Sequence, residues 1–554
     1  MIIMISLRKL PLLLLALAAI FVARLGPASQ ASSFEPSFAT KLTGGDDEII
    51  KEFKKYFKKY KDTPTRVEAV LALEGEENPA VVKALVPVLR DEVSDVRNAA
   101  IRVLGGFKTS RPIKAMMLHF EETNDDMERL GILGAVAVGG YSLSPENFYQ
   151  ALSDKNWEVR RIGIKALVAA AKSAPENRVV LVDPDEKPKR RPRDWPASPE
   201  AAVAPLCTDK EVAVRCAAIE GLADMNSELA VLPSIAALED PVWQVRVSAI
   251  DALKRVRRQE SIGPLVARMQ IEEGRLITDI GVALAELTGR NYGQRKEGWK
   301  SFWDTFSARF SMPTDQAIAD LKAAKKLSAE SYTPAGSVNY HGISTPSRSI
   351  LFVIDVSGSM ENLVIEKERF EDGDYPSFSR IDIVKTELAR TIEGLEPYVT
   401  FNILSFATET DPWKSGLVKA NVLNKSSAMD WTMNLVALGG ASNADVAGAG
   451  LIGAAGLSAG KTNTYGALMW ALGAAGGGLR DKEYEVAVDT IFFLSDGRPS
   501  TGEFVDTEDI LREVLKANEL RKVVLHTIAI GEFQKGFMRQ MAEKSGGVFV
   551  DLGR

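Results

Sequence analysis

Cysteine and histidine are scarce in this chain, with two cysteines and three histidines among 554 residues. So few cysteines exclude a small scaffold held together by disulfide bonds. Cys207 and Cys216 could pair in an oxidising compartment, yet each lies in an apolar helical stretch and is better interpreted as a small core residue. The histidines, His119, His341 and His526, are isolated along the chain, and no Ser-His-Asp or Cys-His set accompanies them. The sequence therefore favours a non-enzymatic protein.

An excess of positive charge is also lacking. The chain has 68 Lys and Arg against 74 Asp and Glu, for a formal net charge of −6. Dedicated nucleic-acid binding is accompanied by a basic bias, so we expect no nucleic-acid partner. Hydrophobic residues make up 45% and charged residues 26%, which is the globular average and excludes both wholesale disorder and a polytopic membrane protein. The length requires two or three folding units.

One apolar run at the N-terminus bears on the cellular localisation of the protein. Residues 10–23 are apolar, follow Arg8 and Lys9, and lead to small residues that end at Ala31. This run is shorter than the roughly 20 residues that span a bilayer, and its order of charged, apolar and small residues is typical of a secretory signal. We expect a signal peptide over residues 1–31, a mature chain beginning near Ser32, and no membrane span after cleavage. The protein would then be exported, to the periplasm, the cell surface or the medium, whereas an uncleaved anchor is the alternative.

A repeated segment fills the first half of the chain. Each copy begins with an aspartate, has an arginine four to six residues later, and continues with apolar residues three and four apart. The clear copies span residues 62–73, 91–104, 154–167, 209–222 and 240–253. The arginines, about 31 residues apart except for one longer step, are Arg66, Arg97, Arg129, Arg160, Arg215, Arg246 and Arg275. Apolar residues at this spacing form one face of a helix, so we expect helix pairs that stack into a solenoid.

The repeat frame, as in DEVSDVRNAAIRVL and DKEVAVRCAAIEGL, resembles HEAT repeats of the short bacterial type. The resemblance implies a helical array over residues 46–310, with a charged, proline-rich inserted loop at about 173–198 that accounts for the longer step. It is weaker around Arg129 and Arg275. Because the aspartate and arginine recur with the repeat, we interpret them as a structural ladder, in which the aspartate caps a helix and the arginine bonds to it or to a neighbouring repeat.

The second half has a different pattern. Residues 311–347 lack periodicity and contain scattered proline and glycine, which is typical of a linker. From residue 348 onward, apolar strands alternate with helices. The expected strands span 350–356, 399–407, 486–494, 522–531 and 548–552, and the expected helices span 381–395, 465–475, 507–521 and 536–544. This order predicts an α/β doubly wound, Rossmann-like domain over 348–554, with a ligand site at the carboxyl ends of its strands. The fold class is therefore multidomain, an all-α solenoid followed by an α/β domain.

Three loops at those strand ends carry hydroxyl and carboxylate groups. They read DVSGSM, GKTNTYGAL and LSDGRP. Oxygen ligands suit Mg²⁺, Ca²⁺ or Mn²⁺, whereas zinc would favour histidine or cysteine. The three loops resemble the metal-ion-dependent adhesion site of von Willebrand factor A domains. The resemblance implies one divalent cation, Mg²⁺ foremost, held by Asp355, Ser357, Ser359, Thr462 and Asp496.

Three further features bear on this expected metal site. Thr464 is the alternative to Thr462, since it lies two residues further on. Residues 438–461 form an Ala/Gly-rich insertion, which either covers the site or has no function. Residues 361–380 form a smaller acidic excursion, which we expect against the same face of the domain.

We expect an exported binding, adhesion or scaffold protein. Its cation would bridge to an Asp or Glu of a protein partner, and the repeats would provide a second interaction surface. The alternatives are a metal-assisted hydrolase, a lyase of the kind to which some HEAT-like repeats belong, and an adaptor of a chelatase-like ATPase complex. The secretory signal argues against the last of these.

Overall fold

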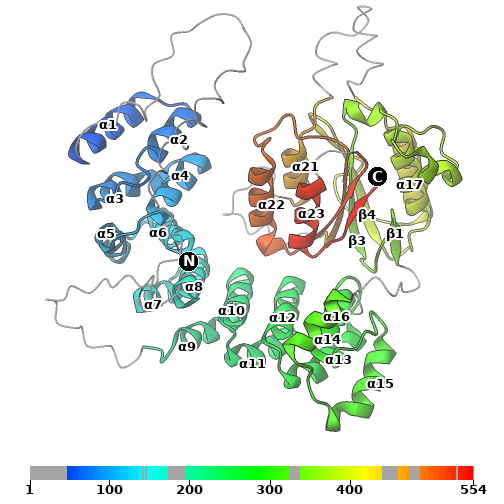
Figure 1. The fold of residues 1–554 in the computed structure, drawn as a ribbon, viewed down its shortest axis with the longest axis horizontal. Coiled ribbons are helices and arrows are strands. Elements are labelled where there is room, and N and C mark those ends of the chain that lie inside the picture. Colours follow the sequence, from blue (N-terminus) through cyan, green and yellow to red (C-terminus); the bar gives the residue numbers. More distant parts are fainter. Residues whose placement is uncertain are drawn as a thin grey trace, which may run out of the picture. The chain divides into compact units, whose positions relative to one another are not determined.

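The computed structural model describes residues 46–139, 143, 146–172, 195–324, 337–438, 460–473, 487–531 and 535–552 (Figure 1). The expected signal peptide and most of the inserted loop and of the Ala/Gly-rich insertion lie outside these residues. The chain forms two compact units, the first ending at His119 and the second beginning at Phe120. Among the helices so described, none is both long enough and apolar enough to cross a membrane.

The first unit consists of short helices. They are α1 (Asp46–Lys59), α2 (Thr63–Leu71), α3 (Pro79–Leu85), α4 (Ser94–Gly105) and most of α5 (Ser110–Glu122). Helix α2 begins where the Asp62 carboxylate accepts from the Thr65 backbone N–H, as in a standard N-cap. On α4 the buried side chains are spaced three and four apart, for example Val96, Ala100 and Val103. This face packs against α2, as the apolar spacing predicts.

Helix pairs also open the second unit. Its helices are α6 (Asp126–Gly139), α7 (Glu146–Leu152), α8 (Trp157–Lys172), α9 (Pro199–Val203), α10 (Val212–Asp224), α11 (Val231–Ala237), α12 (Trp243–Val256), α13 (Ile262–Ile271), α14 (Leu276–Thr288) and α15 (Lys296–Phe306). The even-numbered helices form one row, in which α6 packs on α8, α8 on α10, α10 on α12 and α12 on α14. The other helices pack beside this row (Figure 1). Stacking of successive pairs is the solenoid arrangement that the period predicts.

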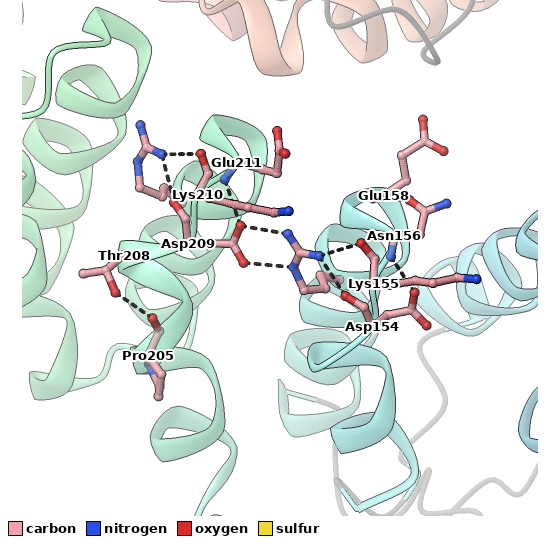
Figure 2. Close-up of polar contacts among 11 residues, drawn as sticks. Asp154, Lys155, Asn156, Glu158, Pro205, Thr208, Asp209, Lys210 and Glu211 are labelled. Carbon is pink, nitrogen blue, oxygen red and sulfur yellow. Dashed lines mark hydrogen bonds and ion pairs between the residues drawn. The ribbon is translucent and has the colours of Figure 1, made fainter.

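The repeated arginines join neighbouring repeats, as predicted. The prediction that the aspartates cap helices holds for Asp62 but is wrong for α4, α10 and α12, which have no side-chain cap; Asp91, Asp209 and Asp240 instead accept from the backbone N–H two residues later. The Arg160 guanidinium donates from Nε and Nη2 to the Asp209 carboxylate of the next repeat, at 2.9 and 2.8 Å. Its Nη1 donates to the Asp154 carbonyl of its own repeat at 2.7 Å (Figure 2). Equivalent ion pairs are Arg66–Asp91, Arg129–Asp154, Arg215–Asp240 and Arg246–Glu272. Arg275 departs from this pattern, since it pairs with Asp279 on its own helix.

The stretch expected as a linker contains ordered elements. Helix α16 (Asp315–Ala323) is followed by a hairpin of β1 (Val338–Tyr340) and β2 (Ile343–Thr345). The hairpin turn, His341-Gly342, has positive φ at both residues, as the tight two-residue turns between antiparallel strands require. Tyr340 is fully buried in the core of the C-terminal domain. Strands of three residues are too short to show an alternating pattern, so the sequence does not reveal that this domain begins before residue 348.

The C-terminal domain is built on a seven-stranded sheet of order β5-β4-β3-β7-β8-β9, with β6 also paired to β4. The strands are β3 (Ser349–Asp355), β4 (Thr400–Phe406), β5 (Thr410–Pro412), β6 (Val418–Lys419), β7 (Thr490–Ser495), β8 (Val524–Ala529) and β9 (Phe549–Asp551). Strands β3, β4, β7 and β8, and the short strand β9 at one edge, pair in parallel as predicted. The antiparallel β5 and β6 at the edge were not predicted, because two or three residues carry no periodic signal.

Helices cover both faces of this sheet (Figure 1). They are α17 (Arg380–Glu393), α18 (Val422–Met433), α21 (Thr464–Ala471), α22 (Thr507–Arg521) and α23 (Lys535–Ser545). Alternate residues of β3 point to the two faces of the sheet. Ile350 and Phe352 pack in the core cluster that includes α17. Leu351 and Val353 pack in the core cluster that includes α21 and α22. A strand buried on both faces requires the continuous apolar run seen in the sequence. This arrangement confirms the doubly wound α/β domain.

We expect His526 to make the stability of the C-terminal domain depend on pH. Its Nδ1 accepts a hydrogen bond from the Val548 backbone N–H at 3.0 Å, and burial lowers the pKa of His526 from 6.5 to about 3. The neutral form is thus favoured in the folded protein, so its contribution is present above pH 6.5 and is lost as the pH falls toward 3. Relative to His526→Gln, the wild type should lose about 1.4 kcal/mol per pH unit between pH 6 and 4. Denaturant unfolding of both proteins across this range would measure the difference, and parallel pH profiles would contradict it.

Candidate metal centre

The carboxyl ends of β3 and β7 bring two loops together. These neighbouring strands pair in parallel, with Ile354 opposite Leu494. Asp355 is the last residue of β3, and Asp496 directly follows the last residue of β7. Both residues are buried. The sheet therefore places two carboxylates at the same edge, where α/β folds bind their ligands.

The Asp355 carboxylate is fixed by one bond to each oxygen. Its Oδ1 accepts from the Ser357 backbone N–H at 2.8 Å, and its Oδ2 accepts from the Ser495 hydroxyl at 2.5 Å. The Gly358 N–H donates to the Gly460 carbonyl at 3.1 Å, which ties this loop to the one that carries Thr462. These contacts hold the first loop against both of the other loops.

The two serines of the first loop lead from Asp355 to Asp496. Their hydroxyl oxygens, Ser357 Oγ and Ser359 Oγ, are 3.3 Å apart, and Ser359 Oγ donates to Asp496 Oδ1 at 2.7 Å. A serine hydroxyl can both donate and accept. The same oxygens could therefore turn their lone pairs to a cation instead of bonding to each other and to Asp496.

Thr462 faces a space that the other loops share. Its backbone N–H donates to the Ser500 hydroxyl at 2.9 Å, which fixes the loop just before α21. A Cβ atom placed on Gly497 would lie 3.3 Å from Thr462 Oγ1, 3.4 Å from Ser359 Oγ and 3.9 Å from Asp355 Oδ2. Oxygen atoms from two loops therefore surround one small space, beside Gly497 of the third loop, which has no side chain. Thr464, the alternative threonine, instead begins α21.

The electrostatics of the pair also fit a cation. Burial, together with the smaller effect of the neighbouring Asp496 charge, raises the pKa of Asp355 from 3.8 to about 7. A bound cation would stabilise the ionised form of this carboxylate. In the part of the chain described, no group of three or more His, Cys, Asp or Glu is arranged to hold a metal. A cation here would thus depend on hydroxyl as well as carboxylate oxygen, a set suited to Mg²⁺, Mn²⁺ or Ca²⁺.

The sequence interpretation missed three residues of this centre. Ser495 bonds to Asp355, Gly497 leaves the shared space open, and Arg380 Nη1 donates to Asp496 Oδ2 at 2.5 Å. The first two stand beside Asp496 in the sequence, so they could have been found with it. Arg380 lies 116 residues from Asp496, and its one local signal is a basic side chain at the start of a helix.

Comparison with protein families matches one segment in the helical region and one in the C-terminal domain. Residues 50–137 match the model for HEAT repeats, and residues 373–551 match the model for the von Willebrand factor type A domain. The C-terminal domain is a von Willebrand factor type A domain. The second match includes Thr462 and Asp496 and begins after Asp355, Ser357 and Ser359. The roles of those three residues in the VWA domain therefore depend on the motif and the geometry.

Curated relatives include inter-alpha-trypsin inhibitor heavy chains. Heavy chain H4 of Homo sapiens is 25% identical over 209 residues, which is 37% of this chain and 18% of the relative. Heavy chain H1 of Mesocricetus auratus is 24% identical over 243 residues, 44% of this chain and 22% of the relative. The similarity thus spans about a fifth of each relative's length.

Solved structures similar to this chain include a von Willebrand factor type A protein from Catenulispora acidiphila. It has a TM-score of 0.25 and 14% identity, and the match covers 38% of this chain and 39% of that chain. An aerotolerance-related membrane protein from Bacteroides fragilis has a TM-score of 0.24 and 12% identity, covering 36% of this chain and 90% of that chain.

We expect Asp355→Asn to stabilise the VWA domain when EDTA removes cations. Because the pKa of Asp355 is raised to about 7 in the folded protein, its stabilising contribution is present below pH 3.8 and is lost as the pH rises through 7. The variant has no such loss, so in EDTA at pH 8 it should be more stable than the wild type by roughly 1 to 3 kcal/mol. The difference should shrink toward pH 4. Denaturant unfolding at both pH values measures it, and an equal difference at pH 4 and 8 would count against a charged, buried Asp355.

Proposed function

We propose that this is an exported, non-enzymatic binding protein, acting in adhesion or as a scaffold. Its VWA domain would hold a divalent cation, Mg²⁺ foremost, and bind an Asp or Glu of a protein partner through that cation. The observation that carries this proposal is the convergence of Asp355, Ser359 and Thr462 oxygens on the space beside Gly497. A binding role also agrees with the assignment to the VWA family.

Each residue of the centre would have a distinct role. Asp355 and Asp496 would supply the negative charge that attracts the cation, and the hydroxyls of Ser357, Ser359 and Thr462 would supply neutral ligands. When bound, the cation would supply a positive charge that a carboxylate of another protein can approach. The bonds from Ser495 to Asp355 and from Ser500 to the Thr462 loop would keep these groups in position beforehand.

Other side chains that could act in catalysis have structural roles instead, which favours a binding protein over a hydrolase or a lyase. His526 accepts from the Val548 N–H and stacks on Phe492, with ring centroids 5.0 Å apart. His341 lies in the turn of the β1–β2 hairpin. In the repeats, the arginines and aspartates bond to one another across successive helix pairs, as Arg160 and Asp209 do. His526 and the arginines and aspartates of the repeats thus already have structural partners, which favours an interaction surface in the repeats over a lyase site.

The same proposal gives the repeats a binding role and places the protein outside the cytoplasm. Stacked helix pairs form extended surfaces that proteins use for binding. The relatives are named as heavy chains of an inhibitor, which agrees with a protein that acts through contacts. Export is supported by the order of charged, apolar and small residues over 1–31.

We expect the full mature chain to gain thermal stability from Mg²⁺ or Mn²⁺. A ligand that binds only the folded state at 100 times its Kd adds about 2.7 kcal/mol, so millimolar cation should raise the melting temperature relative to EDTA. Asp355→Asn and Asp496→Asn should abolish this gain, since each removes a charge from the centre. Asp509→Asn is the matched control, because its carboxylate is exposed and pairs with Arg512 on α22, and it should keep the gain. A wild type that melts at the same temperature in Mg²⁺ and in EDTA would show that the proposed cation role is wrong.

Export predicts processing of the N-terminus. The apolar run and the small residues before Ser32 should direct cleavage there, because signal peptidases cut after small side chains. Sequencing the N-terminus of protein recovered from outside the cytoplasm should therefore begin near Ser32. Intact Met1 on that material would contradict a cleaved signal.

A further inference from the structure

A guanidinium group is built into the candidate metal centre. Arg380 Nη1 donates to Asp496 Oδ2 at 2.5 Å, while Ser359 Oγ donates to the other oxygen, Oδ1, at 2.7 Å. The Asp496 side chain is 0% exposed and that of Arg380 is 13% exposed. Both oxygens of Asp496 thus have donors, and the positive charge lies almost as deep as the carboxylate.

The position of Arg380 is electrostatically unfavourable apart from this contact. Arg380 is the first residue of α17, directly after the capping Ser379, where the helix dipole repels a positive charge. Its Nε is buried and has no hydrogen-bond partner within the described part of the chain. The negative charge of the Asp496 carboxylate offsets this unfavourable placement of the Arg380 guanidinium.

The neighbouring backbone leaves just enough room for this pair. A Cβ on Gly531, two residues after the end of β8, would lie 2.6 Å from the Asp496 carbonyl oxygen and 3.4 Å from Arg380 Nη1. The first distance is a clash, so a side chain at this position would displace the Asp496 backbone. The Arg380 backbone N–H also donates to the Asn362 carbonyl at 2.9 Å, which ties the start of α17 to the segment that follows the loop of Asp355, Ser357 and Ser359.

We propose that Arg380 sets the charge of the metal centre, weakening cation binding and strengthening the binding of an incoming carboxylate. This inference rests on the proposed function, since it requires a cation at the centre. Arg380 acts as a positioning residue that works through Asp496.

The charges of the centre explain both effects. With both carboxylates ionised, as they would be around a bound dication, the one guanidinium leaves the protein groups with a single negative charge. A dication is therefore attracted less strongly than by two free carboxylates. Once the dication is bound, the centre has one net positive charge, whereas it would be neutral without Arg380. In a buried setting a unit charge has a large effect on ionic binding. The ligand that fits this centre is therefore a single carboxylate group.

The first arm of the test measures cation affinity. Full-length mature protein, wild type and Arg380→Gln, is titrated with Mn²⁺ alone, and free Mn²⁺ is followed by electron paramagnetic resonance. We expect Arg380→Gln to bind Mn²⁺ about tenfold more tightly or better, because one repulsive charge has been removed. Arg380→Lys keeps the charge and should stay close to the wild type, whereas a role that depends on guanidinium geometry alone would shift Lys and Gln together.

The second arm measures carboxylate binding with acetate as the probe. Acetate is titrated into the Mn²⁺-saturated proteins, and the loss of metal-bound water is followed through the relaxation rate of water protons. Acetate should bind Arg380→Gln several-fold more weakly than the wild type, the opposite direction from the effect on Mn²⁺. A general loosening of the domain would weaken both.

Controls separate the possible outcomes. Arg390→Gln is the matched control, because Arg390 also lies on α17 and pairs there with Glu387 at the surface. This variant should change neither the affinity for Mn²⁺ nor that for acetate. Arg380→Met provides a second uncharged side chain if glutamine prevents folding in EDTA. If the wild type binds Mn²⁺ and neither uncharged variant binds it more tightly, the charge-setting role is overturned while the metal centre stands. If neither the wild type nor the variants bind Mn²⁺, the proposed function itself is overturned.

Discussion

Two carboxylates buried at one edge of a parallel sheet are the constraint around which the VWA domain is arranged. Asp355 and Asp496 follow neighbouring strands, so the sheet itself determines that they lie close together. Burial, and to a lesser extent the neighbouring charge of Asp496, oppose the ionisation of Asp355. The surrounding groups are donors aimed at these oxygens: the Ser357 N–H, the Ser495 and Ser359 hydroxyls, and the Arg380 guanidinium. The folded domain can thus hold the pair before any ligand arrives.

The chain uses arginine–carboxylate pairs in two different ways. In the helical repeats the pair recurs, as in Arg160–Asp209 and Arg215–Asp240, and each arginine also bonds to a carbonyl of its own repeat. Those pairs serve packing, because the same kind of contact recurs between five pairs of neighbouring repeats. The Arg380–Asp496 pair occurs beside hydroxyls from other loops, and its carboxylate is shared with Ser359. Context, and not the type of ion pair, separates a structural contact from a functional one.

Long patterns made the central part of this fold predictable from the sequence. The strand that ends at Asp355 is a continuous apolar run, and the repeats show the same arginine many times, so both were identified. The five candidate ligands were found through three short motifs, and the structure brings their loops together at one edge of the sheet. The β1–β2 hairpin and the edge strands β5 and β6 were missed because each is at most three residues long. Arg380 was missed for another reason, since its partner is distant in sequence and no local rule pairs a helix start with a remote strand end.

Arginines of the ladder pair with an acidic side chain of the next repeat along the chain, as Arg160 does with Asp209. This arrangement limits the ways in which the repeat array can change in length. From Arg129 to Arg160 the spacing is 31 residues, and Arg66, Arg129, Arg160, Arg215 and Arg246 each pair with an acidic side chain of the next repeat. Removal or duplication of one whole period among these repeats would therefore join the same two surfaces again, and their guanidinium groups would still meet an acidic group. A deletion of any other length would leave a half-buried arginine facing the wrong side chain. Where the ladder is present it makes the helical array modular, so that whole repeats can be added or removed without redesign of the interior.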